Sequence, residues 1–194
     1  NDSRERVKDR PLSRNSKLSY FNKLRACLNQ AFDDRIIAHN PIRGIEGFKV
    51  EEGTRMYLTL DEVKKLSQTE CEYPKIKRAF LFSCLTGLRR SDILKLTWGE
   101  VHQQGDFTRI IFRQKKTGGQ EYLDITQQAA ELMGDRGNPN DYIFTDIYSP
   151  TCTNEAIKRW VLRAGIHKEI TFHVARHCAF SFSLKFNSLQ NISA

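Results

Sequence analysis

Residues 86–98 read TGLRRSDILKLTW and place three charged side chains between a glycine turn and a run of apolar residues. Arg89 and Arg90 follow the glycine closely, and Asp92 stands three residues after Arg89. At that spacing on a helix, a carboxylate can hydrogen-bond an arginine and hold its guanidinium rigid. A rigid guanidinium binds phosphate well. The segment predicts either a structural ion pair at a helix start or an arginine prepared for a phosphate.

The charge balance of the chain favours a polyanionic partner. The 194 residues carry 31 Lys and Arg against 23 Asp and Glu, a formal net charge of +8. Residues 1–50 contribute 11 basic and 6 acidic side chains (+5), and the remainder contributes 20 and 17 (+3). Such an excess favours nucleic acid as the partner, with a generic basic soluble protein as the alternative.

Cysteine content and hydropathy exclude further classes of protein. The five cysteines form no C-x-x-C pair and their number is odd, which argues against a disulfide framework and against a zinc knuckle. This pattern fits a reducing cytosol. No stretch of about 18 or more apolar residues occurs, so we expect no membrane-spanning helix. The N-terminal residues are mainly polar and charged, so we expect no signal peptide.

The spacing of apolar residues predicts a mainly α protein with a small antiparallel β-hairpin, an α+β fold. Residues 107–114 and 120–125 form the two expected strands, and two adjacent glycines supply the turn between them. Apolar steps of three and four residues predict helices over 17–32, from 59, over 74–86, 126–134 and 154–165, and from 171. Ser13 or Ser16 caps the first helix, and Thr171 caps the last. Thr59 and Glu62 form a capping box for the second helix.

Two further groups of basic residues are candidates for binding or catalysis. His173, Arg176 and His177 share one helix face, because they stand at positions i, i+3 and i+4. An imidazole can move a proton while a guanidinium neutralises oxyanion charge. Lys116 lies at the tip of the expected hairpin and can reach into a groove. Taken singly, each group also fits an ordinary solvated surface.

The three motifs in this order resemble those of the tyrosine recombinases, also called the phage-integrase family. The resemblance rests on residues 86–98, on RQKKTGGQEYLDI at 113–125 and on TFHVARH at 171–177. The amino-acid sequences of these motifs are most similar to those of integrases from Bacteroides-type mobile elements. Residues 16–41 resemble the last part of the family's helical core-binding domain.

This resemblance implies the fold and the domain organisation. Residues 1–42 correspond to the C-terminal part of a helical, SAM-like core-binding domain. Residues 43–55 contain three glycines and are expected to be a linker. Residues 56–194 correspond to a tyrosine recombinase catalytic domain that lacks its C-terminal end.

The resemblance also implies roles for individual residues. Arg89 and Arg176 stand where the family has the two arginines that clamp the scissile phosphate, with Asp92 and His177 in support. His173 matches the histidine that takes part in proton transfer. The family needs neither a metal nor another cofactor.

The hairpin lysine is the remaining catalytic position. Lys116 matches the lysine that protonates the leaving 5′-hydroxyl, and Lys115 is the neighbouring candidate because the register of a short hairpin is uncertain. We further expect DNA contacts from several basic residues: Arg90, Lys115, Lys17, Lys23 and Arg25.

The nucleophile is where the chain departs from the family. The family's tyrosine, which forms a 3′-phosphotyrosyl link, follows the H-x-x-R helix. All six tyrosines here precede His173: Tyr20, Tyr57, Tyr73, Tyr122, Tyr142 and Tyr148. Tyr142 and Tyr148 are poor replacements because their strand and loop context differs. A tyrosine supplied in trans is another route. We therefore expect a piece of a recombinase that binds DNA without cleaving it.

The resemblance implies double-stranded DNA as the partner, a homo-tetramer assembled on that DNA, no membrane, and a bacterial cytoplasmic protein at the nucleoid. A non-catalytic DNA-binding or regulatory module on the same scaffold is the first alternative. An unrelated helical domain with a solvated basic surface is the second.

Overall fold

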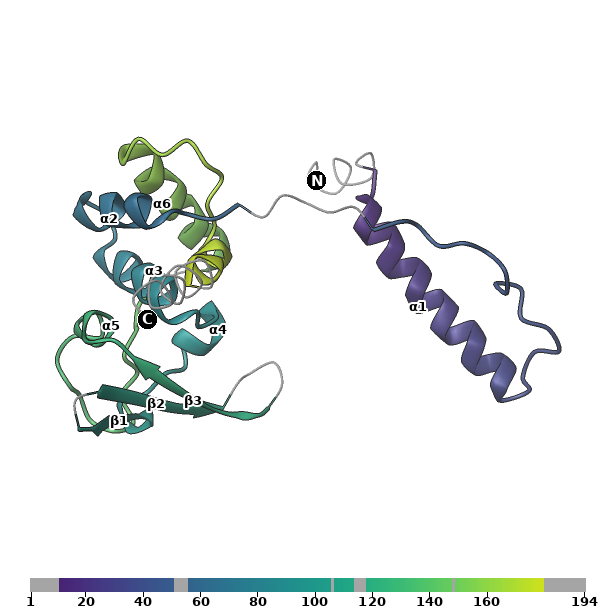
Figure 1. The fold of residues 1–194 in the computed structure, drawn as a ribbon, viewed down its shortest axis with the longest axis horizontal. Helices are drawn as coiled ribbons and strands as arrows, with labels where there is room; N and C mark the ends of the chain where they lie inside the picture. Colours follow the sequence, from purple (N-terminus) through teal and green to yellow (C-terminus); the bar gives the residue numbers. More distant parts are fainter. Residues whose placement is uncertain (1–10, 51–55, 106, 114–117, 148, 180–194) are drawn as a thin grey trace, which may run out of the picture. The chain divides into compact units, whose positions relative to one another are not determined.

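The chain forms two compact units, residues 1–55 and residues 56–194. The computed structural model, shown as a ribbon in Figure 1, describes residues 11–50, 56–105, 107–113, 118–147 and 149–179. None of the helices within these ranges is long and apolar enough to cross a membrane.

The first unit is built on one long helix, α1 (Arg14–Asp33). Its N-cap is Ser13, whose hydroxyl oxygen accepts a hydrogen bond from the Ser16 amide at 3.2 Å. Phe21 packs edge-on against Phe48 at 6.0 Å between ring centroids, and Arg25 donates to the Ile45 carbonyl at 2.7 Å. The segment after α1 therefore folds back along the helix. No residue of α1 is fully buried.

The second unit begins with the predicted capping box. The Thr59 hydroxyl accepts from the Glu62 amide at 3.3 Å, and the Glu62 carboxylate accepts from the Thr59 amide at 2.7 Å. Both donors would otherwise be unpaired at the start of α2 (Leu60–Gln68). The next helix, α3 (Pro74–Thr86), has proline in its first turn, as expected.

Helix α3 is the centre of the second unit. Seven of its thirteen residues are buried, so it is covered on most sides rather than on one stripe. Phe80 makes edge-to-face contacts with Trp160 at 5.7 Å and with Phe172 at 5.9 Å. Trp160 belongs to α6 (Pro150–Arg163), and Phe172 begins a helical segment over residues 172–179. These contacts bring three distant parts of the sequence together.

A three-stranded antiparallel sheet follows α3 along the chain, in the order β1-β2-β3. The strands are β1 (Val101–Gln104), β2 (Phe107–Arg113) and β3 (Gln120–Ile125). The expected hairpin corresponds to β2 and β3, with Arg113 opposite Gln120. Strand β1 was not predicted, because four residues are too few for a clear alternation of polar and apolar side chains. The predicted α+β class is confirmed.

The remaining elements are short and lie between these larger ones: α4 (Arg90–Ile93), the 3-10 helix η1 (Trp98–Glu100) and α5 (Gln127–Glu131). The helix start expected within residues 86–98 corresponds to α4, which is a single turn.

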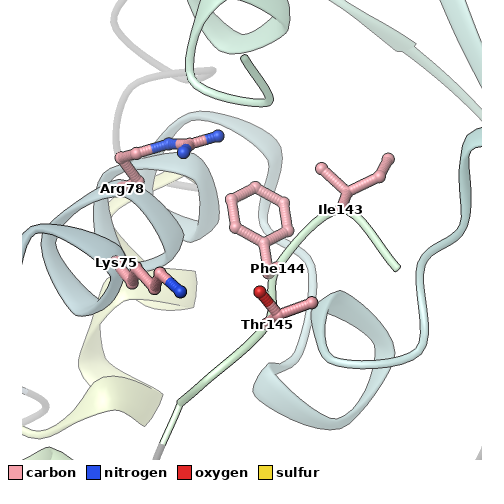
Figure 2. Close-up of a pocket in the computed structure, with 5 residues that line it drawn as sticks. All are labelled: Lys75, Arg78, Ile143, Phe144 and Thr145. Carbon is pink, nitrogen blue, oxygen red and sulfur yellow. The ribbon is translucent and has the colours of Figure 1, made fainter. Parts of the chain in front are cut away.

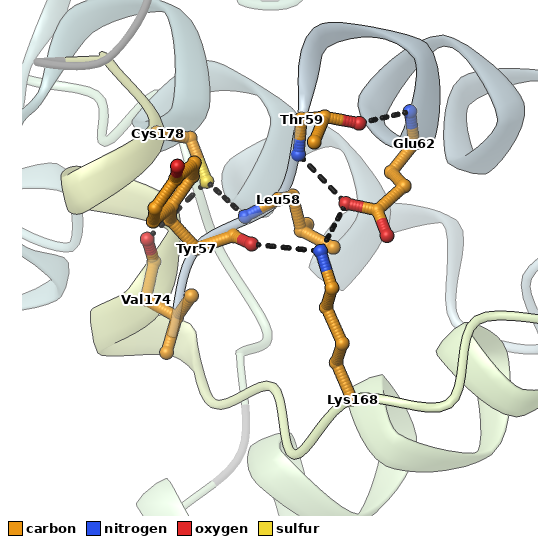
Figure 3. A network of polar contacts seen from close by, with 7 residues as sticks. All are labelled: Tyr57, Leu58, Thr59, Glu62, Lys168, Val174 and Cys178. Atoms are coloured by element: carbon orange, nitrogen blue, oxygen red, sulfur yellow. Dashed lines mark hydrogen bonds and ion pairs between the residues drawn. The ribbon is translucent and has the colours of Figure 1, made fainter. Parts of the chain in front are cut away.

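A polar network fastens the start of the second unit to its C-terminal part (Figure 3). Lys168 donates to the Glu62 carboxylate at 2.7 Å and to the Tyr57 carbonyl at 3.2 Å. The Leu58 amide donates to the Cys178 sulfur at 3.3 Å, and that thiol donates to the Val174 carbonyl at 3.4 Å. The helical segment 172–179 is therefore held at Cys178 by Leu58, which lies just before α2.

Candidate functional site

The glycine turn after α3 sets the direction of Arg89. Gly87 adopts a left-handed backbone with φ +71°, and its amide donates to the Ser83 carbonyl at 2.9 Å, which ends the helix. The buried Ser83 hydroxyl donates to the Leu88 carbonyl at 2.8 Å. Arg89 is therefore the N-cap of α4 on a fixed backbone, directly beside the C-terminal end of the central helix.

Arg89 and Asp92 form the ion pair expected from their spacing. The Arg89 Nη1 and Asp92 Oδ2 atoms are 3.8 Å apart, and the Asp92 side chain is only 3% exposed while that of Arg89 is 27% exposed. A buried carboxylate is costly unless it faces a positive charge. Asp92 therefore holds the guanidinium in place while leaving part of it open to solvent.

Arg176, from the C-terminal part of the second unit, lies in the same region as Arg89. Burial lowers the pKa of Arg176, the positive charge of Arg89 lowers it further, and the Asp92 carboxylate acts in the opposite direction. The geometry agrees, because Arg89 and Arg176 line the same two hollows and Asp92 lines one of them. The structure thus brings Arg89 and Arg176 into one basic site.

Two hollows meet at this arginine pair, and both arginines line each of them. We call the first the sheet-side hollow; its other lining residues are Thr86, Gly87, Leu88, Asp92, Phe112, Glu121, Tyr122 and Leu123. We call the second the helix-side hollow; its other lining residues are Ser83, Leu88, Arg90, Pro150, Asn154, Thr171, Phe172 and His173. A single anion at the boundary could contact both guanidinium groups.

The two histidines of the H-x-x-R segment differ in their placement. His173 is exposed and lines the helix-side hollow next to Arg176. The His177 ring packs edge-on against His173 with 5.0 Å between ring centroids. His173 is therefore the imidazole that lines the hollow, and the His177 ring packs against it.

Arg90 lines the helix-side hollow too, which adds a third guanidinium to it. Burial lowers the pKa of Arg90, as it does that of Arg176. The helix-side hollow therefore carries three arginines and a histidine, a composition suited to an anion with several oxygens.

The other predicted basic residues belong to the expected hairpin turn and to the first unit. Lys115 and Lys116 fall outside the described residues. Lys17 is exposed on α1 of the first unit, and Lys23 lies over the Tyr20 ring at 5.7 Å. Arg25 is engaged within its own unit by Phe21 and the Ile45 carbonyl, so its guanidinium has a structural role.

Asn154 is a residue of the site that sequence reasoning missed. Its side-chain oxygen accepts a hydrogen bond from the Phe172 amide at 2.9 Å, at the first residue of the segment that carries His173 and Arg176. The predicted cap of this segment, Thr171, contributes its backbone carbonyl, which accepts from the Val174 amide at 3.0 Å. No pattern in the sequence could link Asn154 to a helix start 18 residues away.

Another small pocket lies between α3 and residues 143–145 (Figure 2). Two cations line it, but both are engaged. Arg78 donates to the backbone carbonyls of Leu132 and Met133, and Lys75 pairs with Asp146. The cations of this pocket therefore connect α3 to neighbouring segments of the same unit. In the described part of the chain, no group of three or more His, Cys, Asp or Glu side chains could hold a metal ion.

Comparison with known proteins identifies similar chains. XerD tyrosine recombinase from Listeria innocua is 26% identical over 174 residues, which are 81% of this chain and 59% of that protein. This chain thus spans less than two thirds of the curated relatives it matches. Among solved structures, the Tn1549 transposon integrase in complex with circular intermediate DNA has a TM-score of 0.65 at 19% identity, over 90% of this chain and 67% of that chain.

A lambda integrase tetramer bound to a Holliday junction has a TM-score of 0.61 at 20% identity, over 81% of this chain and 51% of that chain. At such identities, both structures show a shared fold. The SAM-like domain model of phage integrases matches residues 4–50, within the first unit. The phage integrase family model matches residues 56–188, which hold every residue of the arginine site, and the chain therefore belongs to the phage integrase family.

Proposed function

We propose that this chain binds the backbone of double-stranded DNA through the arginine site, as part of a site-specific tyrosine recombinase. The observation that carries the proposal is the convergence of Arg89 and Arg176 on the same two hollows, with the buried Asp92 beside them. Two guanidinium groups at one point are matched to the two non-bridging oxygens of a phosphodiester.

The surrounding residues divide the chemistry of strand cleavage among them. Arg89 and Arg176 neutralise the negative charge on the non-bridging oxygens of the phosphate, Asp92 holds Arg89, and His173 takes part in proton transfer. Lys116 protonates the leaving 5′-oxygen, with Lys115 as the alternative. The reaction forms a bond from a tyrosine oxygen to phosphorus and breaks the bond from phosphorus to the 5′-oxygen. The two guanidinium groups supply the positive charge that a metal ion would otherwise provide, so the proposal needs no metal or cofactor.

The tyrosine for that attack is the missing element in these 194 residues. All six tyrosines precede His173. Tyr142 is exposed, and its backbone is tied to Thr97 by an isolated bridge; Tyr148 lies outside the described residues. We expect this chain alone to bind DNA without cleaving it, and the tyrosine to come from a further segment or a partner chain.

The relatives support the choice of partner. The Tn1549 integrase is bound to circular intermediate DNA, and lambda integrase is a tetramer bound to a Holliday junction. By analogy, the whole protein works on double-stranded DNA as a homo-tetramer, at the nucleoid in a bacterial cytoplasm.

Binding to a fluorescein-labelled DNA duplex, followed by anisotropy, tests the arginine site. Arg89→Ala and Arg176→Ala should each weaken binding by at least about tenfold, because a charge-assisted contact is worth about 1.5–3 kcal/mol. Arg159→Ala is the matched control, since Arg159 is an exposed arginine paired with Glu72, next to the opposite end of α3. An equal loss of DNA affinity in all three variants would show only a general effect of net charge, and it would contradict a specific role for Arg89 and Arg176.

A non-catalytic DNA-binding or regulatory module is the second candidate, favoured by the position of the tyrosines. A suicide DNA duplex, whose cleaved end diffuses away, separates the candidates. We expect the 194-residue chain to form no covalent adduct. An adduct formed by this chain alone would show that one of the six tyrosines is a nucleophile.

A further inference from the structure

The helical segment 172–179 carries His173 and Arg176, and its first turn is held by a residue of another helix. The Phe172 amide, at the start of this segment, donates to the Asn154 side-chain oxygen at 2.9 Å. The first amides of a helix have no partner within it, so an acceptor supplied from α6 fixes where the segment begins. Phe172 itself is buried against Phe80. The backbone next to His173 is therefore fixed from two sides.

Asn154 also lies at the arginine site. It is half-buried and lines the helix-side hollow together with Arg89, Arg90, His173 and Arg176. Its oxygen is used by Phe172, which leaves the two hydrogens of its amide nitrogen as donors. Asn154 is thus a residue of another helix that both lines the hollow and bonds the start of the H-x-x-R segment.

The choice of asparagine over aspartate carries information. At a helix start, aspartate accepts the same hydrogen bond and its charge gains from the helix dipole, so it would be at least as good a cap. In this hollow, however, a carboxylate would lie among three arginines and compete with a phosphate for them. A neutral amide holds the helix and leaves the guanidinium groups to the ligand.

We infer that Asn154 is a positioning residue of the phosphate site, which holds the His173–Arg176 segment in place and is uncharged so that the arginines stay available for the DNA backbone. This inference rests on the proposed function, because it assigns Asn154 to the same phosphate. Asn154 acts through His173 and Arg176.

Two substitutions separate the two parts of this role. Asn154→Ala removes the acceptor, so hydrogen exchange at the Phe172 amide should quicken and duplex affinity should fall, each by about fivefold for the loss of a typical cap. Asn154→Asp keeps the acceptor, so exchange at Phe172 should stay slow while affinity falls by at least as much. The control is Cys152→Ala, an exposed and uncharged change on the same helix, which should alter neither quantity.

Arg176→Ala provides the reference for interpreting these results. If Asn154 acts through Arg176, adding Asn154→Ala to Arg176→Ala should weaken binding by less than it does alone. If Arg176→Ala weakens binding but Asn154→Ala and Asn154→Asp do not, the inference is wrong and the proposed function stands. If Arg176→Ala has no effect on binding, the proposed function itself fails. Full affinity in Asn154→Asp alone would overturn the argument for a neutral side chain.

Discussion

Arg89, Asp92 and Arg176 form a charge cluster of two guanidinium groups and one buried carboxylate. The positive charge of Arg89 is one of the reasons why the pKa of Arg176 is lowered, so the two guanidinium groups repel each other. One buried carboxylate offsets part of that repulsion. A bound phosphate would supply further negative charge, which explains why the cluster suits this ligand.

Asp92→Asn tests this balance at a single atom. The variant keeps the shape of the side chain and removes its charge, so the free energy of unfolding should fall by about 1–3 kcal/mol. Sulfate should restore more stability to the variant than to the parent, because the anion replaces the lost charge. Urea unfolding with sodium sulfate, against sodium chloride at equal ionic strength, measures both effects. An identical response of the two proteins to sulfate would contradict the balance.

At the scale of an element, the capping box of α2 shows how local sequence sets a helix start. Thr59→Ala should lower the free energy of unfolding by about 1 kcal/mol, because the Glu62 amide loses its acceptor. DNA affinity should be unchanged, since Thr59 is not among the residues that line either hollow. Ser67→Ala on the exposed side of α2 is the control. A large loss of DNA binding in Thr59→Ala would show that the position of α2 matters to the site.

Glu62 of the same helix should make the free energy of unfolding depend on pH in the acid range. Burial, the largest single effect, raises the pKa of Glu62, but hydrogen bonds from Lys168 and Thr59 with the charge of Lys168 outweigh it, so the pKa lies below its ordinary value of 4.5. A lowered carboxyl pKa stabilises the fold above the ordinary pKa, and this contribution is lost as the pH falls through the lowered value.

Glu62→Gln should therefore be less stable than the parent at neutral pH, and the difference should shrink below about pH 4.5. Urea unfolding across a pH series measures it. Lys168→Met, which removes the partner charge, should reduce the same acid-dependent part. A difference between parent and Glu62→Gln that is constant down to pH 3 would contradict this assignment.

At the scale of the whole molecule, the net charge of +8 predicts that the proposed DNA binding depends on salt concentration. The logarithm of the affinity should fall linearly with the logarithm of the salt concentration, with a slope near −0.9 for each phosphate contacted. Removing Arg176 should reduce the slope by about one. Anisotropy titrations at several potassium chloride concentrations measure it. An affinity that does not change with salt would favour the unrelated helical domain.

The sequence by itself determined the parts whose causes are local. The capping box at Thr59, the glycine that ends α3 and the ion pair of Arg89 with Asp92 each depend on residues within a few positions of one another, so spacing was enough to predict them. The order of the three basic motifs pointed to the family for a related reason, since chain order is a property of sequence.

Only the tertiary structure decided which distant residues meet. Arg176 comes close to Arg89 because Phe80 of α3 packs against both Trp160 and Phe172, and the Phe172 segment carries Arg176. Asn154 caps that segment across 18 residues for the same reason. Burial of apolar surface drives such packing and has no direction, so a sequence pattern shows which faces are apolar but not which faces pair.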